Sequence, residues 1–351
     1  MRTKLALVSV ALAACTSASP VSPPVDAGVD AASPPAWQVL LDAKELDRPV
    51  LSVWGSAPGD VYAVGGPRGN SGFQALALRF DGAGWRDLEP GGADTFWWVH
   101  GTGPSDVWMV GEMGRVAHWD GRRFVEHARL TKATLFGVWA ASATDVWAVG
   151  GTPEGGTGAD NDVVLHFDGK TWAKSPLPGT QKGRALFKVW GSSAEDVYVV
   201  GEHGSIWHRK GGAWALESDP PLAKGTLLTV AGCGKGEVYA VGGRDVLRSD
   251  GTTWSRVDVE VLNDVSGVAC GPSGSVVIVG SGGLKQRLVN GAWKDDFGKE
   301  PFTDLHGAWS DGAGAFWAGG GDFLSKPAPG VKRRGVVTRF APGLAPSRAI
   351  R

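Results

Sequence analysis

The three tyrosines of this sequence, Tyr62, Tyr198 and Tyr239, are the residues that would serve as nucleophile in a sialidase-type glycosidase. Such an enzyme combines a tyrosine nucleophile with an acidic partner and with arginines that bind the substrate carboxylate. Each tyrosine, however, stands in the same short motif, Asp/Glu-Val-Tyr-Ala/Val-Val-Gly, and other copies of this motif carry tryptophan in its place, as in residues 106–111. We therefore interpret the tyrosines as structural residues and expect no sialidase-type mechanism.

Candidate metal ligands are spread along the chain. His118, His166 and His208 occupy one position in three successive copies of the repeat described below, so we expect them in separate units. Asp160 and Asp162 flank an asparagine and offer oxygen ligands for calcium, but the run lacks the ordered spacing of a calcium loop. No zinc spacing, P-loop, nucleophile elbow or dinucleotide-binding glycine motif is present. We expect no metal and no cofactor, and we keep Asp160 and Asp162 as candidate ligand contacts on a solvated turn.

Tryptophan is frequent, with 17 residues, and most of them recur at equivalent positions of the repeat. Such residues are explained by packing between repeats. Trp97 does not recur as tryptophan, but it aligns with Phe136 and Phe187 and is also expected in the core. Trp98 is different, because the equivalent positions hold Ser52, Gly137, Lys188 and Thr229. An indole face can stack on a sugar ring, so Trp98 is a candidate ligand contact, with core packing as the alternative.

The repeat itself consists of a V-W-G segment followed by a D-V-W/Y-A-V-G segment. The second segment occurs at residues 60–65, 106–111, 145–150, 196–201 and 237–242, and in degenerate form at 275–280 and 315–320. From Trp54 to Trp309 the seven copies have an average period of about 42 residues, which is typical of a propeller blade with four strands. Abundant Val, Trp, Thr and Gly also favour short strands and turns. The sequence predicts an all-β fold, a single seven-bladed β-propeller over residues 37–351.

Each repeat divides into four strand-sized segments, of which the third alternates apolar residues and the fourth opens with an aromatic residue. The third strands are expected at residues 76–80, 115–119, 163–167, 205–209, 245–249, 284–288 and 336–340. The seventh repeat has no fourth strand of its own, because the tail Ala341–Arg351 lacks the pattern. Trp37–Leu41 has this pattern and precedes the first repeat. We expect it to pair with Val336–Phe340 and to close the ring, which would remove exposed strand edges.

The turns between third and fourth strands contain Asp-Gly before an aromatic residue, as in FDGAGW, WDGRRF, FDGKTW and SDGTTW. Asp-Gly is a strong hairpin signal, because both residues tolerate positive φ. These turns resemble shortened Asp-box turns of sialidase-type and photosystem assembly-factor propellers. With VWGSAPGDVYAVG and VWGSSAEDVYVVG, the folded region resembles bacterial lipoprotein β-propellers built from WGSSxxDVWAVG repeats, as found in myxobacteria-like genomes. The resemblance implies the fold and does not imply a ligand.

The N-terminus has the layout of a secretory signal. Arg2 and Lys4 precede an apolar run from Leu5 to Ala14 that is too short to span a bilayer. Leu12-Ala13-Ala14-Cys15 resembles the lipobox of bacterial lipoproteins, which implies cleavage after residue 14 and acylation of Cys15 by fatty acids such as palmitate. The alternative is an ordinary signal peptide with an incidental cysteine. Thr16 after the cysteine favours the outer membrane by the sorting habit of that family.

Residues 15–36 are rich in Pro, Ala, Ser and Asp and show no periodicity, so we expect a lipidated cysteine followed by an extended tether. The 54 glycines follow no collagen period. The formal net charge of -1 excludes the basic footprint of a nucleic-acid-binding protein. We expect a monomer anchored by lipid at the outer membrane or cell surface.

Cys233 and Cys270 come just after the expected first strands of repeats five and six. In an exported protein two such cysteines are expected to pair. Two buried thiols are the alternative, because both residues replace small side chains.

The connections of a propeller divide between its two faces. Those from first to second and from third to fourth strand are short here, whereas the others carry insertions at residues 67–75, 151–162, 173–185 and 321–335. Irregular loops gathered on one face of a regular scaffold often carry function, although drift in tolerant loops has the same appearance.

Two functions are compatible with these features. The first is a surface-tethered, non-catalytic binding or scaffold protein that recognises a protein, a glycan or an envelope component through the loop-rich face. The second is a propeller-type lyase or glycosidase-like enzyme at the channel mouth, with Lys188, His306 and Asp304 as candidate site residues.

Overall fold

The computed structural model describes residues 33–67, 72–155, 158, 160–179, 183–217, 221–323, 332–343 and 348–351. The predicted signal peptide, Cys15 and most of the predicted tether lie outside the described residues. Residues Ser33–Arg351 form one compact unit.

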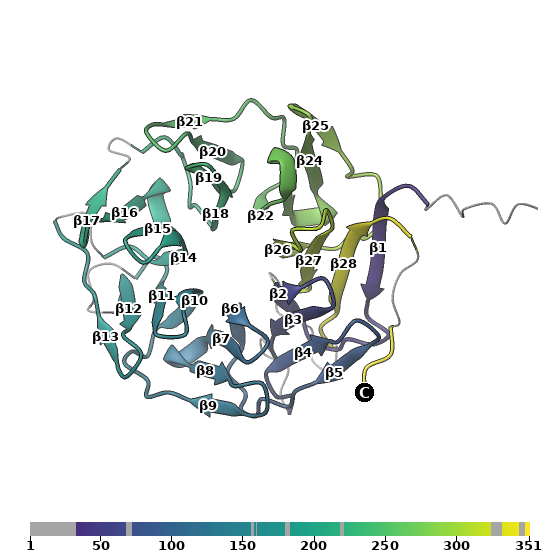
Figure 1. Ribbon diagram of the computed structural model, residues 1–351, viewed down its shortest axis with the longest axis horizontal. Helices are drawn as coiled ribbons and strands as arrows, with labels where there is room; N and C mark the ends of the chain where they lie inside the picture. The colour runs from purple at the N-terminus through teal and green to yellow at the C-terminus, as the bar shows by residue number, and fades with distance from the viewer. Residues whose placement is uncertain are drawn as a thin grey trace, which may run out of the picture. The chain divides into compact units, whose positions relative to one another are not determined.

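This unit is a seven-bladed β-propeller of 28 strands, in which every blade is a four-stranded antiparallel sheet. In Figure 1 the innermost strands surround the central axis and the outermost strands form the rim. The prediction of fold class is confirmed. Blades one to three contain β2 (Val50–Ala57), β3 (Asp60–Gly65), β4 (Leu76–Phe80), β5 (Trp85–Asp87); β6 (Phe96–Gly103), β7 (Asp106–Gly111), β8 (Val116–Trp119), β9 (Phe124–Glu126); β10 (Thr134–Ser142), β11 (Asp145–Gly151), β12 (Val163–Phe167) and β13 (Trp172–Lys174).

The remaining blades repeat this order of strands. They contain β14 (Leu186–Ser193), β15 (Asp196–Gly201), β16 (Ile206–Lys210), β17 (Ala213–Leu216); β18 (Thr229–Gly234), β19 (Glu237–Gly242), β20 (Asp245–Ser249), β21 (Trp254–Arg256); β22 (Val265–Cys270), β23 (Val276–Gly280), β24 (Lys285–Val289), β25 (Ala292–Asp295); and β26 (Leu305–Ser310), β27 (Phe316–Gly321), β28 (Gly335–Ala341) and β1 (Ala36–Leu41).

The ring closes through its N-terminal strand, as the sequence predicts. β1 pairs antiparallel with β28, with Trp37 opposite Phe340, and Figure 1 shows the two strands side by side. The seam also reaches blade six, because Trp37 Nε1 donates a hydrogen bond of 3.0 Å to Asp296 Oδ2. The last blade is therefore completed by a strand that lies about 300 residues away in the chain.

Three third strands begin one residue later than expected. Short 3₁₀ turns, η1 (Glu112–Gly114), η2 (Glu202–Gly204) and η4 (Ser281–Gly283), precede β8, β16 and β24, and η3 (Pro272–Gly274) precedes β23. The N–H of the first residue after each turn bonds back to the first carbonyl of the turn, as from Arg115 to Glu112. The expected first residues Arg115, Ser205 and Leu284 are thus used to close the turns. No helix in the described part of the chain is long and apolar enough to cross a membrane.

The C-terminal tail forms no strand of its own within the described residues, as predicted. Ile350 nevertheless makes an isolated parallel bridge with Trp85 of the outermost strand β5. The Trp85 N–H donates to Ala349 O at 3.0 Å, and the Arg351 N–H donates to Trp85 O at 2.9 Å. The tail covers part of an edge that would otherwise be free to pair.

The hydrophobic core lies between neighbouring blades. One cluster, for example, combines Tyr62 and Ala77 of blade one with Val99, Val107 and Met109 of blade two. Each sheet therefore buries side chains on both faces, and the stability of a blade depends on its two neighbours.

Ring closure predicts a large effect of substitutions in β1. Leu41 is fully buried in the cluster shared by blades one and seven, so Leu41→Ala is expected to lower the free energy of unfolding by about 2–5 kcal/mol. Urea denaturation measures this change. Leu262→Ala, at an exposed residue, is the matched control. Equal stability of the two variants would contradict the closing role of β1.

Candidate functional site

The wall of the central channel is built from aromatic side chains that cross from one blade to the next. One position of the innermost strands, held by Trp54 in blade one, carries an aromatic residue in five of the seven blades. In four of them its indole lies against a glycine of the next blade, so that a Cβ on the glycine would come within 1.9–3.0 Å of the ring. The pairs are Trp54 with Gly101, Trp139 with Gly191, Trp190 with Gly232, and Trp309 with Gly55. Sequence reasoning assigned these tryptophans to the core, but they also form a surface around the channel.

His100 takes the same place in blade two. Its Nδ1 accepts a hydrogen bond of 3.1 Å from the Ala140 N–H of blade three, which requires that nitrogen to be unprotonated. Burial lowers the pKa of His100 to about 4. The ring is thus a neutral member of the wall at physiological pH and not a free general base.

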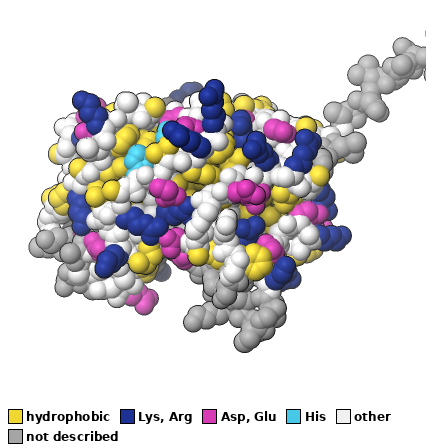
Figure 2. Space-filling view, turned by 90° about the horizontal axis from the view of Figure 1, so that it is seen from below, with side chains coloured by type: hydrophobic (Ala, Val, Ile, Leu, Met, Phe, Trp, Pro, Cys, Tyr) yellow, Lys and Arg dark blue, Asp and Glu magenta, His cyan; other side chains and the backbone are white. Residues whose placement is uncertain are grey.

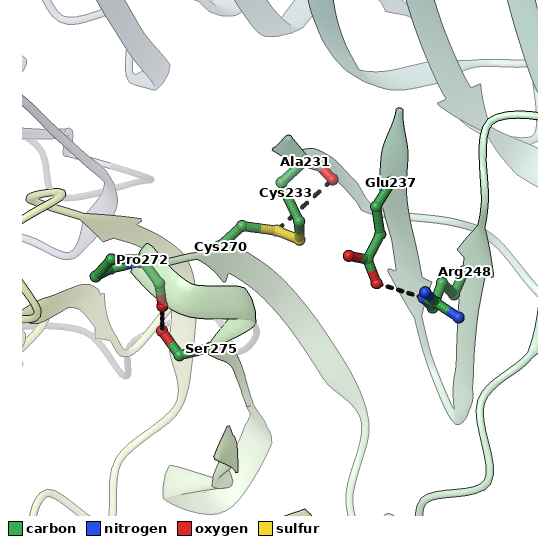
Figure 3. Close-up of a disulfide and its surroundings, with 7 residues drawn as sticks. All are labelled: Ala231, Cys233, Glu237, Arg248, Cys270, Pro272 and Ser275. Atoms are coloured by element: carbon green, nitrogen blue, oxygen red, sulfur yellow. Dashed lines mark hydrogen bonds and ion pairs between the residues drawn. A yellow bond between two sulfur atoms is a disulfide. The ribbon is translucent and has the colours of Figure 1, made fainter. Parts of the chain in front are cut away.

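Blade five breaks the pattern, because Ala231 stands in the aromatic position and Cys270 stands in the glycine position of blade six. Here Cys270 forms a disulfide with Cys233, with the two Cα atoms 4.9 Å apart. Figure 3 shows the disulfide bridging the two innermost strands beside Ala231. A covalent bond therefore joins the two blades at the point where the aromatic contact is missing.

The channel contains a cavity of about 220 Å³. Its lining residues come mostly from the middle of each innermost strand, and in blade five from the start of β18. Among the described residues, the wall combines the indoles of Trp54, Trp98, Trp139, Trp190 and Trp309 with valine and alanine side chains and with the polar residues His100, Lys188, Thr229 and Ser310. No acidic residue is among these lining residues.

Lys188 is the charged side chain in this lining. Its residue is only 3% exposed. Nζ donates a hydrogen bond of 2.9 Å to Phe136 O and lies 3.9 Å from the centroid of the Trp98 ring. No acidic side chain in the described ranges forms an ion pair with it. Burial lowers the pKa of Lys188 to about 7.

A layer of aromatic rings lies across the channel next to this cavity, on the side of the longer connections. Trp97 contacts Phe136 at a centroid distance of 4.9 Å, and Phe136 stacks on Phe187 at 4.9 Å. Trp97 also contacts His306 of blade seven at 5.7 Å, although blade one lies between them. The rings therefore meet across the channel, and Trp97 belongs to a packed layer as expected.

The predicted site residues divide into two groups. His306 lies 6.4 Å from Trp98 between ring centroids, so it belongs with Trp98 and Lys188 at the channel, and its Nδ1–H donates to Leu51 O at 2.6 Å. The side chains of the other group bond to partners outside the cavity lining. Asp160 pairs with Lys174 at 3.3 Å, the Asp162 carboxylate accepts the Gly183 N–H, and Asp304 accepts the Gly282 N–H.

The three third-strand histidines have structural partners within their own blades. His118 stacks on Trp108 with a centroid distance of 4.2 Å and bonds to Asp106 at 2.8 Å. His166 and His208 repeat this arrangement with an aromatic residue and an aspartate of the preceding strand. Burial raises the pKa of all three tyrosines. Within the described residues, no three His, Cys, Asp or Glu side chains lie together as a metal site.

Comparison with known proteins supports the fold more than a function. No protein-family profile matches the chain. Among curated proteins, the immune protein Tsi7 of Pseudomonas aeruginosa is 28% identical over 165 residues, which are 44% of this chain and 52% of that protein. The chain thus matches about half the length of this relative.

Solved structures resemble the whole ring. Virginiamycin B lyase from Staphylococcus aureus superposes with a TM-score of 0.65 at 14% identity, over 87% of this chain and 99% of that chain. YCF48 bound to D1 peptide gives a TM-score of 0.62 at 14% identity, over 88% and 99%. The WD40 propeller domain of Doa1 gives 0.65 at 10% identity, over 87% and 97%. At these identities the similarity concerns the propeller fold alone.

The disulfide is expected to stabilise the junction between blades five and six, where the aromatic contact is missing. Replacing it through Cys233→Ala with Cys270→Gly should lower the free energy of unfolding by about 4 kcal/mol on the chain-entropy model. Adding Ala231→Trp restores an aromatic–glycine pair and should recover part of this loss in urea denaturation. Ala231→Trp alone is the control, since Cys270 then occupies the space and the change should destabilise. If adding Ala231→Trp does not raise the stability of the double variant, an aromatic–glycine contact cannot replace the disulfide, and the interpretation is wrong.

Lys188 is expected to make stability depend on pH. Between pH 7 and about 10.4, the ordinary lysine pKa, the unfolded chain binds a proton that the folded chain has lost. The contribution of Lys188 to the free energy of unfolding therefore rises with pH in that window. Below pH 7 the folded chain bears the full cost of burying the charged ammonium.

Lys188→Met removes that cost, so its melting temperature relative to the parent should be highest at pH 6 and should fall steadily towards pH 9.5. Differential scanning calorimetry measures the difference. Lys170→Met, at an exposed turn lysine, is the control. A difference that stays constant with pH would rule out a buried titrating ammonium.

Proposed function

We propose that this protein is an exported, lipid-anchored, non-catalytic binding protein that holds a protein partner on its loop-rich face. The loop-rich face is defined by the second-to-third connections within blades and by the fourth-to-first connections between blades. Cys15 is the proposed acylated residue, and the outer membrane or cell surface is the proposed location.

One observation carries the choice of face. Five large hydrophobic side chains are exposed within the described residues, and four of them lie in these connections. They are Met113, Leu222, Leu262 and Phe302, with exposed fractions of 49%, 38%, 57% and 59%. They stand on connections of different blades but on the same face, where exposed apolar side chains are available to contact a protein partner.

The net charge and the distribution of charged side chains favour a partner recognised through apolar contacts over a highly charged ligand. The formal net charge is -1. Figure 2, the ring seen from its rim, shows Lys and Arg side chains interspersed with Asp and Glu instead of gathered in a patch of one sign. Bulk electrostatic steering is therefore not the basis of the proposal.

Known proteins with related features also favour a protein partner. The partial relative is named as an immune protein. One structural neighbour, YCF48, is described in complex with D1 peptide. From the YCF48 complex the proposal takes only the class of ligand, a polypeptide.

The channel supports binding over catalysis. The titratable side chains in the cavity lining are His100 and Lys188. A backbone N–H already occupies Nδ1 of His100, and Lys188 lies against a carbonyl and an indole. General acid–base chemistry needs a group within reach of a substrate proton and a suitable partner, and this lining offers no paired acid and base.

The test uses the mature chain, residues 15–351, with Cys15→Ser so that it is not acylated. We expect it to retain a protein from envelope extract in saturable fashion, and Leu262→Ser with Phe302→Ser to lower that retention at least tenfold. Val125→Ser is the matched control, because Val125 is exposed on the outer strand β9. Equal retention by the double variant, retention of glycans alone, or chemical turnover of the ligand would overturn the proposal.

The anchor is tested in the full-length protein in a bacterial host. A palmitate analogue should label the parent protein, and Cys15→Ser should remove the label and release the protein from the membrane fraction. Labelling of the Cys15→Ser variant would refute acylation at this residue.

A further inference from the structure

We propose that the channel cavity is a binding site for a small monocarboxylate whose apolar body is about the size of one aromatic ring. The site is distinct from the loop-rich face, because the layer formed by Trp97, Phe136, Phe187 and His306 lies across the channel next to the cavity on that side. The inference therefore goes beyond the proposed function and does not depend on it.

The size and lining of the cavity define the apolar body of the ligand. A dry apolar cavity of about 150 Å³ accepts benzene, and drug-sized ligands fill about 300–1,000 Å³. The 220 Å³ of this cavity lies between these values. About half of the lining surface is apolar and is supplied largely by indoles and valines, and the rest is polar. Ala231 and Ala269 leave space on blades five and six, where other blades place an aromatic ring. One ring with a short polar substituent fits these dimensions.

The charge of the cavity defines the polar end of the ligand. Lys188 is a nearly fully buried cation in a lining that contains no acidic side chain. A lysine ammonium has three donors, and here one goes to Phe136 O while the Trp98 face lies 3.9 Å away. A donor therefore remains for a ligand oxygen. An unpaired buried charge is costly, so a bound anion would restore the electrostatic balance.

The rest of the lining favours a carboxylate with a single charge. The Thr229 hydroxyl donates to Ser266 O, and so its hydrogen is already used. His100 is neutral and its Nδ1 acts as acceptor. Among the described residues of the lining, Lys188 is thus the one cation, which matches a monoanion and leaves a phosphate dianion with uncompensated charge beside the indoles.

Isothermal titration calorimetry at pH 6 tests the proposal on the mature chain with Cys15→Ser. The probes are phenylacetate and its neutral analogue phenylacetamide, and quenching of tryptophan fluorescence gives a second readout. We expect phenylacetate to bind with one site per chain and at least tenfold more tightly than the amide. Equal affinity for acid and amide, or no saturable binding of either, would overturn the proposal.

Two variants separate the charge from the shape of the site. Lys188→Met should abolish the tenfold preference for the acid. Ala269→Trp with Ser310→Gly copies the tryptophan–glycine pair of other blades, narrows the cavity and should remove binding of both probes. Lys170→Met should leave both affinities unchanged. If Lys188→Met keeps the preference, or if the narrowed cavity binds normally while circular dichroism shows an intact fold, the site is elsewhere and the proposal fails.

A further arm identifies the source of the carboxylate. The peptide Gly-Gly-Phe with a free C-terminus is compared with its C-terminal amide and with phenylacetate. Tighter binding of the free peptide indicates the end of a polypeptide chain, and tighter binding of phenylacetate indicates a free metabolite. Both results support the site, whereas binding of the amidated peptide as tightly as the free one contradicts it.

Discussion

The propeller depends on the contact between an aromatic ring of one innermost strand and a glycine of the next blade. A ring can lie flat on the neighbouring strand only where no Cβ stands in its way, and in four blades an added Cβ would come within 1.9–3.0 Å of the ring. The same contact fixes the spacing between blades and supplies the wall of the channel. Stability and the candidate ligand cavity therefore share the same side chains, so substitutions of these tryptophans will affect both.

Much of the fold could be predicted because each blade repeats the same sequence motif and the same four-stranded sheet. The period of the motif indicates the number of blades, and the missing fourth strand of the last repeat indicates that Trp37–Leu41 closes the ring. Strand ends were less predictable where 3₁₀ turns follow the second strand, because Arg115, Ser205 and Leu284 look like strand residues but serve to close a turn. The pairing of Ile350 with Trp85 gave no periodic signal at all.

The candidate site was predicted only in part, and for a physical reason. Trp98 was recognised because it interrupts a repeated position, and Lys188 because it lies near an innermost strand. A linear sequence does not reveal that the lysine of blade four reaches back to the indole of blade two. Asp160 and Asp162 attracted attention by their type, yet their partners are local. The alanines in blades five and six were overlooked, although the loss of a repeated aromatic residue is a signal of open space as well as of drift.

The closing strand has a mechanical consequence for the proposed tether. Any tension applied to the chain ahead of Ala36 enters the ring through β1, whose hydrogen bonds join it to β28 and whose Trp37 is held by Asp296 of blade six. The load is thus divided between two neighbouring blades before it reaches the channel. Because Leu40 and Leu41 at the far end of β1 are fully buried, the strand resists being peeled away at the end where it continues into blade one.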